Sequence, residues 1–254
     1  MRSTISAVII TQNEEEHVFE LMNSLEWVDE VIAVDSYSSD RTNFFFEKAG
    51  AKVYQREFDN FSSQRNFSIS KATKDWVLCV DSDERVSLEL AEEIQKMLEQ
   101  ESTPNAFRIR IHNYLNKKRV MYSGWTEDQH IRLFQRAKGA YTDVLVHELL
   151  SVPKPHGLME YPLLHYTRIS LSKVRKYAGF QAGEINRSNK SVFYIWQILW
   201  RPLFRFLETL IYRKGILDGL NGIQIASKDG LEVAYKLIYF VQLRMKRGQE
   251  NDGI

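Results

Sequence analysis

Cysteine is almost absent from this chain of 254 residues, which contains only Cys79. A single thiol excludes an internal disulfide framework and a zinc site built from several cysteines. It also fits a protein of a reducing compartment. The apolar run near the N-terminus, residues 5–11, is short and is followed by acidic residues. It therefore predicts a strand and not an export signal.

Long apolar runs are also missing. A membrane-spanning helix needs about 20 mostly apolar residues, whereas Arg201 and Arg205 interrupt the most apolar part of the C-terminal third. The sequence that follows the first expected strand, "TQNEEE", contains no glycine. It thus lacks the glycine-rich turn that dinucleotide-binding oxidoreductases use, and a sugar nucleotidyltransferase would need such a turn as well.

Charge is present but unevenly placed. The net charge is +1, yet residues 168–247 hold 15 Lys/Arg and 5 Asp/Glu, a balance of +10, which leaves −9 for the remainder. An acidic front and a basic, aromatic back suggest two different surfaces. The acidic front would repel phosphate backbones, so we expect no nucleic-acid partner.

Strand and helix patterns alternate four times in about one hundred residues, which predicts a parallel sheet with helices on both faces. The expected strands are residues 5–11, 30–35, 51–57 and 75–81. Residues 106–124 alternate like an antiparallel hairpin. From residue 170 the pattern is mostly helical, with interruptions at Pro202 and in region 215–222. We expect a catalytic domain over residues 1–168 and a helical, basic and aromatic region over 169–254.

Polar residues follow three of these strands. Asp81 and Asp83 come directly after the buried strand that ends at Val80, Asp35 ends the second strand, and Thr11 ends the first. Ligands bind at the carboxyl ends of strands in such sheets. Two carboxylates one residue apart suit Mg²⁺ or Mn²⁺, which also takes phosphate oxygens as ligands. An Asp-x-Asp step alone is a weak signal and is more typical of a solvated surface turn. Its place after an apolar strand, at the edge where ligands bind, favours the metal site.

These segments, in this order, resemble family 2 glycosyltransferases, and most closely the bacterial lipopolysaccharide-core β-glucosyltransferase group. The similarity covers about residues 6–148, and a later segment resembles that group's C-terminal region. The segments that carry it are "AVIITQNEEE", "DEVIAVDSYSSDRT", "QRNFSISKATKDWVLCVDSDERV", "GWTEDQHIRLF", "VHE" and "WRPLFRFLETLIYRKGILDG". The resemblance implies a GT-A fold (Rossmann-like), a nucleotide-sugar donor, a divalent metal and inversion at the anomeric carbon.

The resemblance also implies a donor site. The residues that would bind the nucleotide-sugar are Thr11, Asn13, Glu14, Asp35, Arg65 and Asp81. Asp83 would hold the metal on the diphosphate, and His147 could be a further ligand or hold a phosphate. For Asn13 and Glu14 the alternative is helix capping, and for Arg65 it is an ion pair on a helix surface.

Transfer with inversion needs one general base for the acceptor hydroxyl. The family places it in a Glu-Asp step, which implies Asp128, with Glu127 as the rival. Acceptor contacts would come from Trp125, Arg132 and Glu148. Arg132 would pair with Asp128 or with a phosphorylated acceptor, and the alternative for Trp125 is ordinary packing.

The sequence thus predicts transfer of a hexose, glucose from UDP-glucose first, to a lipid-linked glycan such as the lipopolysaccharide core. The alternatives are a polyprenyl-linked or capsule precursor as acceptor, or a catalytically silent membrane scaffold. We expect a cytoplasmic protein, peripheral on the inner face of the cell membrane, because rings such as Trp196, Trp200 and Phe204 lie among basic residues. Packing of these rings on the catalytic domain is the alternative.

Overall fold

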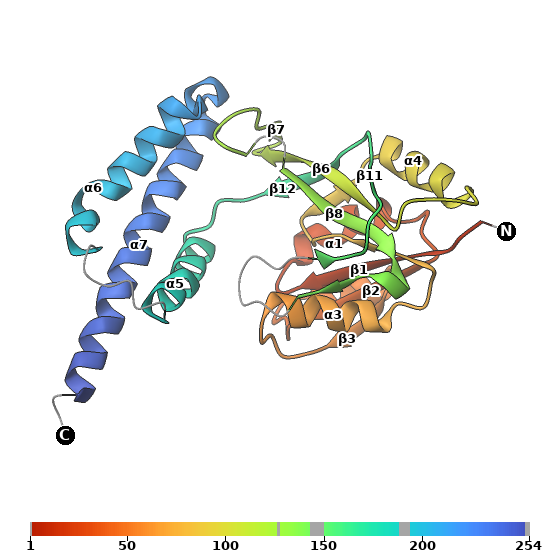
Figure 1. Cartoon of the computed structure of the whole chain (residues 1–254), viewed down its shortest axis with the longest axis horizontal. Helices are drawn as coiled ribbons and strands as arrows, with labels where there is room; N and C mark the ends of the chain where they lie inside the picture. Colours follow the sequence, from red (N-terminus) through yellow and green to blue (C-terminus); the bar gives the residue numbers. More distant parts are fainter. Residues whose placement is uncertain (1, 126–127, 143–149, 188–193, 252–254) are drawn as a thin grey trace. The chain divides into compact units, whose positions relative to one another are not determined.

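The computed structural model describes residues 2–125, 128–142, 150–187 and 194–251 (Figure 1). The chain divides into two compact units. The first unit comprises residues 1–112 and 127–166, and the second comprises 113–126 and 167–254. A hairpin tip from the middle of the chain therefore belongs to the same unit as the C-terminal helices.

The first unit is built on a mixed sheet. Its parallel part has the order β3-β2-β1-β4, and it continues through β8, β6, β12 and β5. The strands are β1 (Ile5–Thr11), β2 (Glu30–Asp35), β3 (Lys52–Gln55), β4 (Trp76–Cys79), β5 (Glu84–Val86), β6 (Ala106–Leu115), β8 (Asp128–Gln135), β11 (His156–Leu158) and β12 (Leu163–Thr167). β8 runs antiparallel to β4 and to β6, and β11 runs parallel to β6. A separate pair is formed by β9 (Ala140–Tyr141) and β10 (Leu150–Ser151).

Helices cover both faces of this sheet. α1 (Glu15–Asn23), α2 (Thr42–Lys48) and α4 (Leu88–Leu98) bury Leu21, Phe46 and Ile94 in one core, while α3 (Phe61–Lys71) buries Ile69 in the other (Figure 1). Side-chain caps fix where two of them begin, because Asn60 accepts from the amide of Ser63 and Ser87 from that of Leu90. The predicted α/β fold with a mostly parallel central sheet is confirmed.

One strand pairing was not expected, and one local expectation needs correction. The chain pairs again directly after the Asp-x-Asp turn, since β5 is antiparallel to β12, with Glu84 opposite His165. This strand has three residues, too few for a periodic signal. Pro202 does not interrupt its helix: α6 (Tyr194–Leu207) runs through it. A proline removes only one backbone donor from a helix, so α6 can continue through it. The interruption predicted in region 215–222 is confirmed in part, since the chain is not α-helical at Arg213–Gly219.

The second unit is mostly helical. Its elements are β7 (Lys118–Arg119), which pairs with the end of β6, α5 (Leu171–Arg187), α6, a π-helical turn η2 (Glu208–Tyr212), a 3₁₀ turn η3 (Gly215–Asp218) and α7 (Leu220–Asn251). η1 (Arg136–Lys138) is a 3₁₀ turn of the first unit. The start of α7 packs on η3 so closely that a Cβ on Gly222 would lie 1.7 Å from the carbonyl oxygen of Gly215. No helix within the described residues is long and apolar enough to cross a bilayer.

Candidate active site

The polar ends of the parallel strands meet at one edge of the sheet. Thr11 and Asp35 are register partners at the ends of β1 and β2. The amide of Val80, just before Asp81, donates to the carbonyl of Val8 on β1 over 3.1 Å. The neighbouring rim positions predicted from the sequence are therefore confirmed for these three strands, in line with the general location of ligands in such sheets.

Side chains of the rim tie the first two loops together. Asn13 Oδ1 accepts from the amide of Ser39 over 2.8 Å, and the amide of Asn13 donates to Ser38 Oγ over 2.8 Å. The carboxylate of Asp35 accepts from the amide and the hydroxyl of Ser38 and, over 2.9 Å, from Asn43 Nδ2. The position before α1 is Glu14, and no side-chain bond caps this helix. The capping alternative for Asn13 and Glu14 is therefore wrong.

Two buried polar atoms at this rim have no hydrogen-bond partner among the described residues. They are Thr11 Oγ1 and Asn43 Oδ1. Buried polar atoms are rarely left without partners in proteins, so each such case calls for an explanation. Both residues adjoin the buried carboxylate of Asp35, one through strand pairing and one through a hydrogen bond. Unused hydrogen-bonding capacity therefore lies where the sequence predicts a nucleoside.

Asp81 is held between two arginines. Its Oδ1 accepts from Arg65 over 2.8 Å and its Oδ2 from Arg132 over 3.1 Å. Arg132 also donates to Glu84 over 2.8 Å, and Glu84 accepts from the amide of Asp81 over 2.8 Å. The guanidinium of Arg65 lies over the ring of Tyr141, 5.6 Å from its centroid. The result is a compact cluster of two acids and two bases at the end of β4.

Burial and charge shift the pKa values of this cluster in opposite directions. Burial alone would raise the pKa of Asp81, but the charges of Arg65 and Arg132 outweigh it and hold that pKa well below its usual range. Burial raises the pKa of Glu84, which Arg132 only partly offsets. Asp81 is thus firmly ionised, and both of its oxygens already bind guanidinium groups.

The predicted pairing of Arg132 with Asp128 is wrong. Arg132 is 8% exposed and bonds to Asp81 and Glu84, while Asp128 Oδ1 lies 2.9 Å from His130 Nε2. The physical reason is that buried carboxylates need a counter-charge far more than an exposed one does. The surface alternative for Arg65 is wrong as well, since its side chain is 11% exposed and points to Asp81.

Asp83 faces a histidine that the sequence did not single out. His165 Nε2 lies 3.3 Å from Asp83 Oδ2, and the amide of Tyr166 donates to the carbonyl of Asp83 over 2.8 Å. Burial alone would lower the pKa of His165, but its hydrogen bond to Asp83 and the charge of that carboxylate outweigh burial and raise it. The second aspartate thus faces an imidazole, whereas the first is bound by arginines.

Comparison with a protein-family model identifies the family of this chain. Residues 6–147, more than half of the chain, match the model for Glycosyl transferase family 2. The chain belongs to glycosyl transferase family 2. The match includes the rim residues, the arginine-bound Asp81 and the Asp83 turn, and it ends at His147.

Several relatives of this family 2 glycosyltransferase are named as glycosyltransferases. It is 27% identical over 231 residues to the lipopolysaccharide core biosynthesis glycosyltransferase LpsC of Rhizobium meliloti, covering 86% of this chain and 84% of LpsC. This chain is 26% identical over 239 residues to an uncharacterized glycosyltransferase of Rickettsia typhi and covers 80% of that protein's length. It is 46% identical to an uncharacterized glycosyltransferase of Rickettsia conorii, but only over 92 residues, 33% of that protein's length.

Solved structures share its fold. TarS of S. aureus, residues 1–349, in complex with UDP superimposes with a TM-score of 0.51 at 16% identity, covering 96% of this chain and 92% of that one. The complex of the same protein with UDP-GlcNAc gives a TM-score of 0.50. At this identity the likeness establishes the fold, and the GT-A architecture predicted for this family 2 glycosyltransferase is confirmed.

Asp83 and His165 are two described residues of this family 2 glycosyltransferase that could hold a divalent cation. A carboxylate and an imidazole that face each other supply two ligands, and Mg²⁺ or Mn²⁺ completes its shell with water and phosphate oxygens. No group of three His, Cys, Asp or Glu able to hold a metal occurs in the described part of the chain. His147 lies outside the described residues, so its predicted metal contact stays a prediction.

The predicted acceptor residues have different surroundings. Asp128 begins β8 with a side chain that is 61% exposed, as a base for an incoming hydroxyl requires. Trp125, in the second unit, packs half-buried against a core that includes Leu115 and Ile225, which is the packing alternative. Glu127 and Glu148 lie outside the described residues. Contacts of any of these with an acceptor stay predictions.

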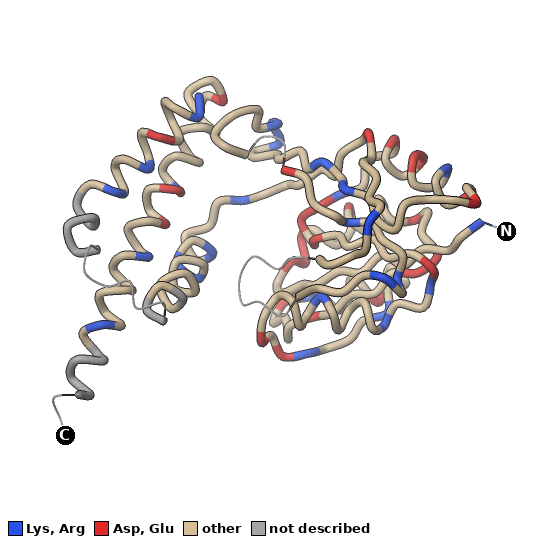
Figure 2. Tube along the Cα trace, viewed as in Figure 1, with Lys and Arg blue, Asp and Glu red and all other residues tan. Residues whose placement is uncertain are grey.

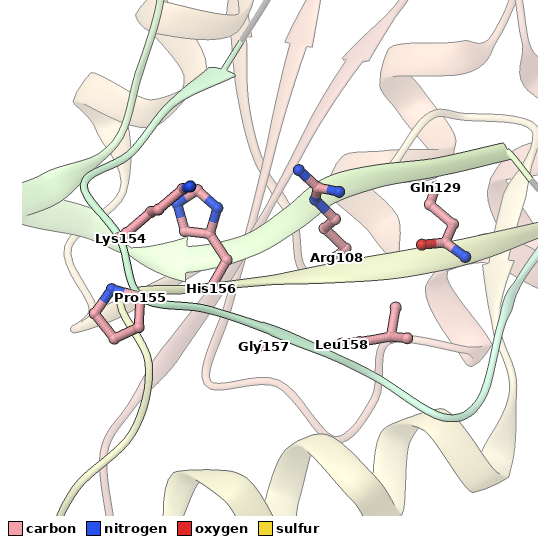
Figure 3. Close-up of a pocket in the computed structure, with 7 residues that line it drawn as sticks. All are labelled: Arg108, Gln129, Lys154, Pro155, His156, Gly157 and Leu158. Carbon is pink, nitrogen blue, oxygen red and sulfur yellow. The ribbon is translucent and has the colours of Figure 1, made fainter.

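A pocket of about 770 Å³ opens elsewhere on the first unit (Figure 3). Its lining comes from β6, β8, β11 and the two residues before β11, and it consists of Arg108, Gln129, Lys154, Pro155, His156, Gly157 and Leu158. None of the residues predicted from the sequence lines it. This pocket therefore does not coincide with the predicted site, and the rim of the sheet remains the candidate site in this family 2 glycosyltransferase.

Proposed function

We propose that this family 2 glycosyltransferase moves a hexose, glucose in the first instance, from a UDP-sugar to a lipid-linked glycan such as a lipopolysaccharide core. The observation that carries the proposal is the arrangement at the strand ends. There Asp83 faces His165, Asp81 is bound by two arginines, and unpaired polar atoms adjoin Asp35. Support also comes from the name of the relative LpsC and from TarS, whose UDP and UDP-GlcNAc complexes share this fold.

The nucleotide would lie along the rim. Thr11, Asn13, Glu14 and Asp35 would contact the nucleoside, with Asp35 as the buried acceptor for uracil or ribose groups. A Mg²⁺ or Mn²⁺ ion held by Asp83 and His165 would neutralise the diphosphate as its bond to the sugar breaks. Asp81 would hold Arg65 and Arg132 in place beside the nucleotide, and its own predicted contact with the ribose remains part of the proposal.

The chemistry would be a single in-line displacement. An acceptor hydroxyl attacks the anomeric carbon, the bond from that carbon to the diphosphate breaks, and UDP leaves with the electron pair. Asp128 takes the hydroxyl proton, and the exposed carboxylate beside His130 is open to an incoming glycan. Attack from the face opposite the leaving group inverts the anomeric configuration.

The acceptor and the site of action belong to the proposal as well. A lipid-linked glycan requires a protein that works at a membrane surface. The basic and aromatic C-terminal region would bring this peripheral protein to the inner face of the cell membrane, because Lys and Arg are attracted to anionic lipid. A polyprenyl-linked or capsule precursor would use the same donor chemistry, so acceptor assays must distinguish them.

The test is calorimetric titration of UDP in the presence of Mn²⁺ and then with a chelator. We expect metal-dependent binding that Asp83→Ala abolishes and that the matched control Glu99→Ala, an exposed acid on the end of α4, leaves intact. A full-length protein that binds UDP in neither condition would refute the donor assignment and favour the scaffold alternative. Binding that survives chelation would refute the metal.

A further inference from the structure

One face of α6 is apolar and exposed. Trp200, Leu203, Phe204 and Leu207 are 52%, 61%, 57% and 41% exposed. Their spacing of i, i+3, i+4 and i+7 places them on one face of the helix. We call these four residues the outer stripe. Such a stripe normally faces a core, so its exposure needs an explanation.

The opposite face of α6 and its continuation is already packed. Thr209 Oγ1 donates to Asp229 of α7 over 2.8 Å. A Cβ on Gly230 of α7 would lie 3.0 Å from the carbonyl oxygen of Pro202 and 3.5 Å from Cβ of Phe206. The core of the second unit is therefore formed by the other side of the helix, and the outer stripe does not contribute to that core.

A second apolar group follows in the turn between α6 and α7. Tyr212, Ile216, Leu217 and Leu220 are 84%, 64%, 62% and 78% exposed, and we call them the turn cluster. Asp218 within this turn accepts from the amides of residues 121 and 122 in the hairpin tip over 2.9 and 3.1 Å. The turn is thus anchored in a fixed position while its large apolar side chains point away from the unit.

The exposed area is large. The three aromatic rings Trp200, Phe204 and Tyr212 alone expose roughly 300–500 Å², given the size of such side chains. Apolar patches beyond a few hundred Å² mark surfaces that bind a protein, a ligand or a membrane. The aliphatic members of the outer stripe and the turn cluster add further exposed apolar area.

The charges around the patch point to one of these partners. Glu208 forms ion pairs with Arg205 and Arg213 at 3.0 and 2.9 Å. Asp218 accepts hydrogen bonds from the hairpin tip. Arg201 and Lys214 are exposed, and no acid among the described residues pairs with either. Figure 2 shows further Lys and Arg along α5, α6 and α7. An apolar surface with free basic groups and internally paired acids complements an anionic lipid surface.

We propose that the outer stripe and the turn cluster form the surface by which the second unit enters the headgroup region of an anionic bilayer. Rings and aliphatic side chains would lie at the level of the acyl boundary, and Arg201 and Lys214 would contact lipid phosphates. The inference deepens the proposed function and rests on it in one respect, that the acceptor is lipid-linked. Binding to lipid itself requires no donor.

The experiment is vesicle flotation of the full-length chain with phosphatidylcholine alone and with equal parts of phosphatidylcholine and phosphatidylglycerol. We expect the protein to float with the anionic vesicles. The double variant Phe204→Glu, Leu207→Glu should lose this binding by about tenfold or more. The double variant Arg201→Gln, Lys214→Gln should weaken anionic binding roughly fivefold per charge removed.

The matched control is Leu88→Glu, since Leu88 is 73% exposed on α4 of the first unit; it should float like the wild type. Circular dichroism verifies that each variant is folded. Wild-type protein that ignores both kinds of vesicle, or stripe variants that bind like the control, would overturn the inference. So would a wild-type dimer in light scattering that the stripe variant dissociates, because a second copy would then cover the patch. UDP titration without vesicles tests the donor site separately, so failure of one proposal is distinguishable from failure of the other.

Discussion

Glu30 offers the sharpest test of how charge stabilises the first unit. This carboxylate is 7% exposed at the start of β2 and accepts from Ser6 Oγ over 2.6 Å and from Lys52 Nζ over 2.7 Å. It also accepts from the amide and the hydroxyl of Thr73 over 2.9 and 3.0 Å. It thereby joins three strands and the turn before β4, and Glu30→Gln would remove its charge with little change in shape.

The magnitude follows from its pKa. Burial alone would raise the pKa of Glu30, but the hydrogen bonds from Lys52, Ser6 and Thr73 outweigh burial and lower it from 4.5 to about 2. That difference corresponds to about 3 kcal/mol of stability. Because the folded-state pKa is the lower one, this stability is fully present above pH 4.5 and is lost as the pH falls toward 2.

The assay is urea unfolding of wild type and Glu30→Gln from neutral to acidic pH, followed through Trp27 and Trp76 of the first unit. We expect the variant to be about 3 kcal/mol less stable at neutral pH, and this gap to close below pH 4.5. Glu99→Gln, at an exposed position, should show no gap at any pH. A gap that stays constant into acid would refute the reasoning, since the ionised carboxylate would then not be its source.

Three further changes test the site and the second unit. Asp128→Asn should lower turnover by about 10²–10⁴-fold with UDP affinity unchanged, and equal loss of UDP affinity would argue against a base. Arg132→Met should cost about 3–5 kcal/mol in urea unfolding, because two buried carboxylates lose their partner; a cost below about 1 kcal/mol would contradict the cluster. Gly222→Ala should destabilise the second unit by about 1–3 kcal/mol or more in thermal unfolding, since its Cβ would meet the carbonyl of Gly215. Unchanged melting would show that this close approach is relaxed in solution.

The sequence predicted the sheet and its rim well, for a physical reason. Runs such as residues 5–11 and 75–81 are nearly all apolar, and a strand of that kind is stable only between two covered faces. Once the strands are parallel, their carboxyl ends must meet, so Thr11, Asp35 and Asp81 were placed without any knowledge of contacts.

The partners within the site were not predictable in the same way. Arg132 meets Asp81 and Glu84 across separations of 51 and 48 residues. His165 reaches Asp83 only because β12 pairs with a three-residue strand. Local periodicity does not contain such information. The histidine in the stretch "LLHYT" was the one available signal, and a single histidine on a strand is usually structural.

The two aspartates after β4 have different partners. An ionised carboxylate at the end of a buried strand is unstable without a counter-charge. The counter-charge of Asp81 comes from two arginines whose side chains are themselves buried. Asp83 lies two residues further, where the chain has turned, and faces the imidazole of His165. In the proposed function, Asp83 and His165 would hold the cation, because both oxygens of Asp81 already bind guanidinium groups. The different partners of the two aspartates therefore favour the second aspartate as the metal ligand of that proposal.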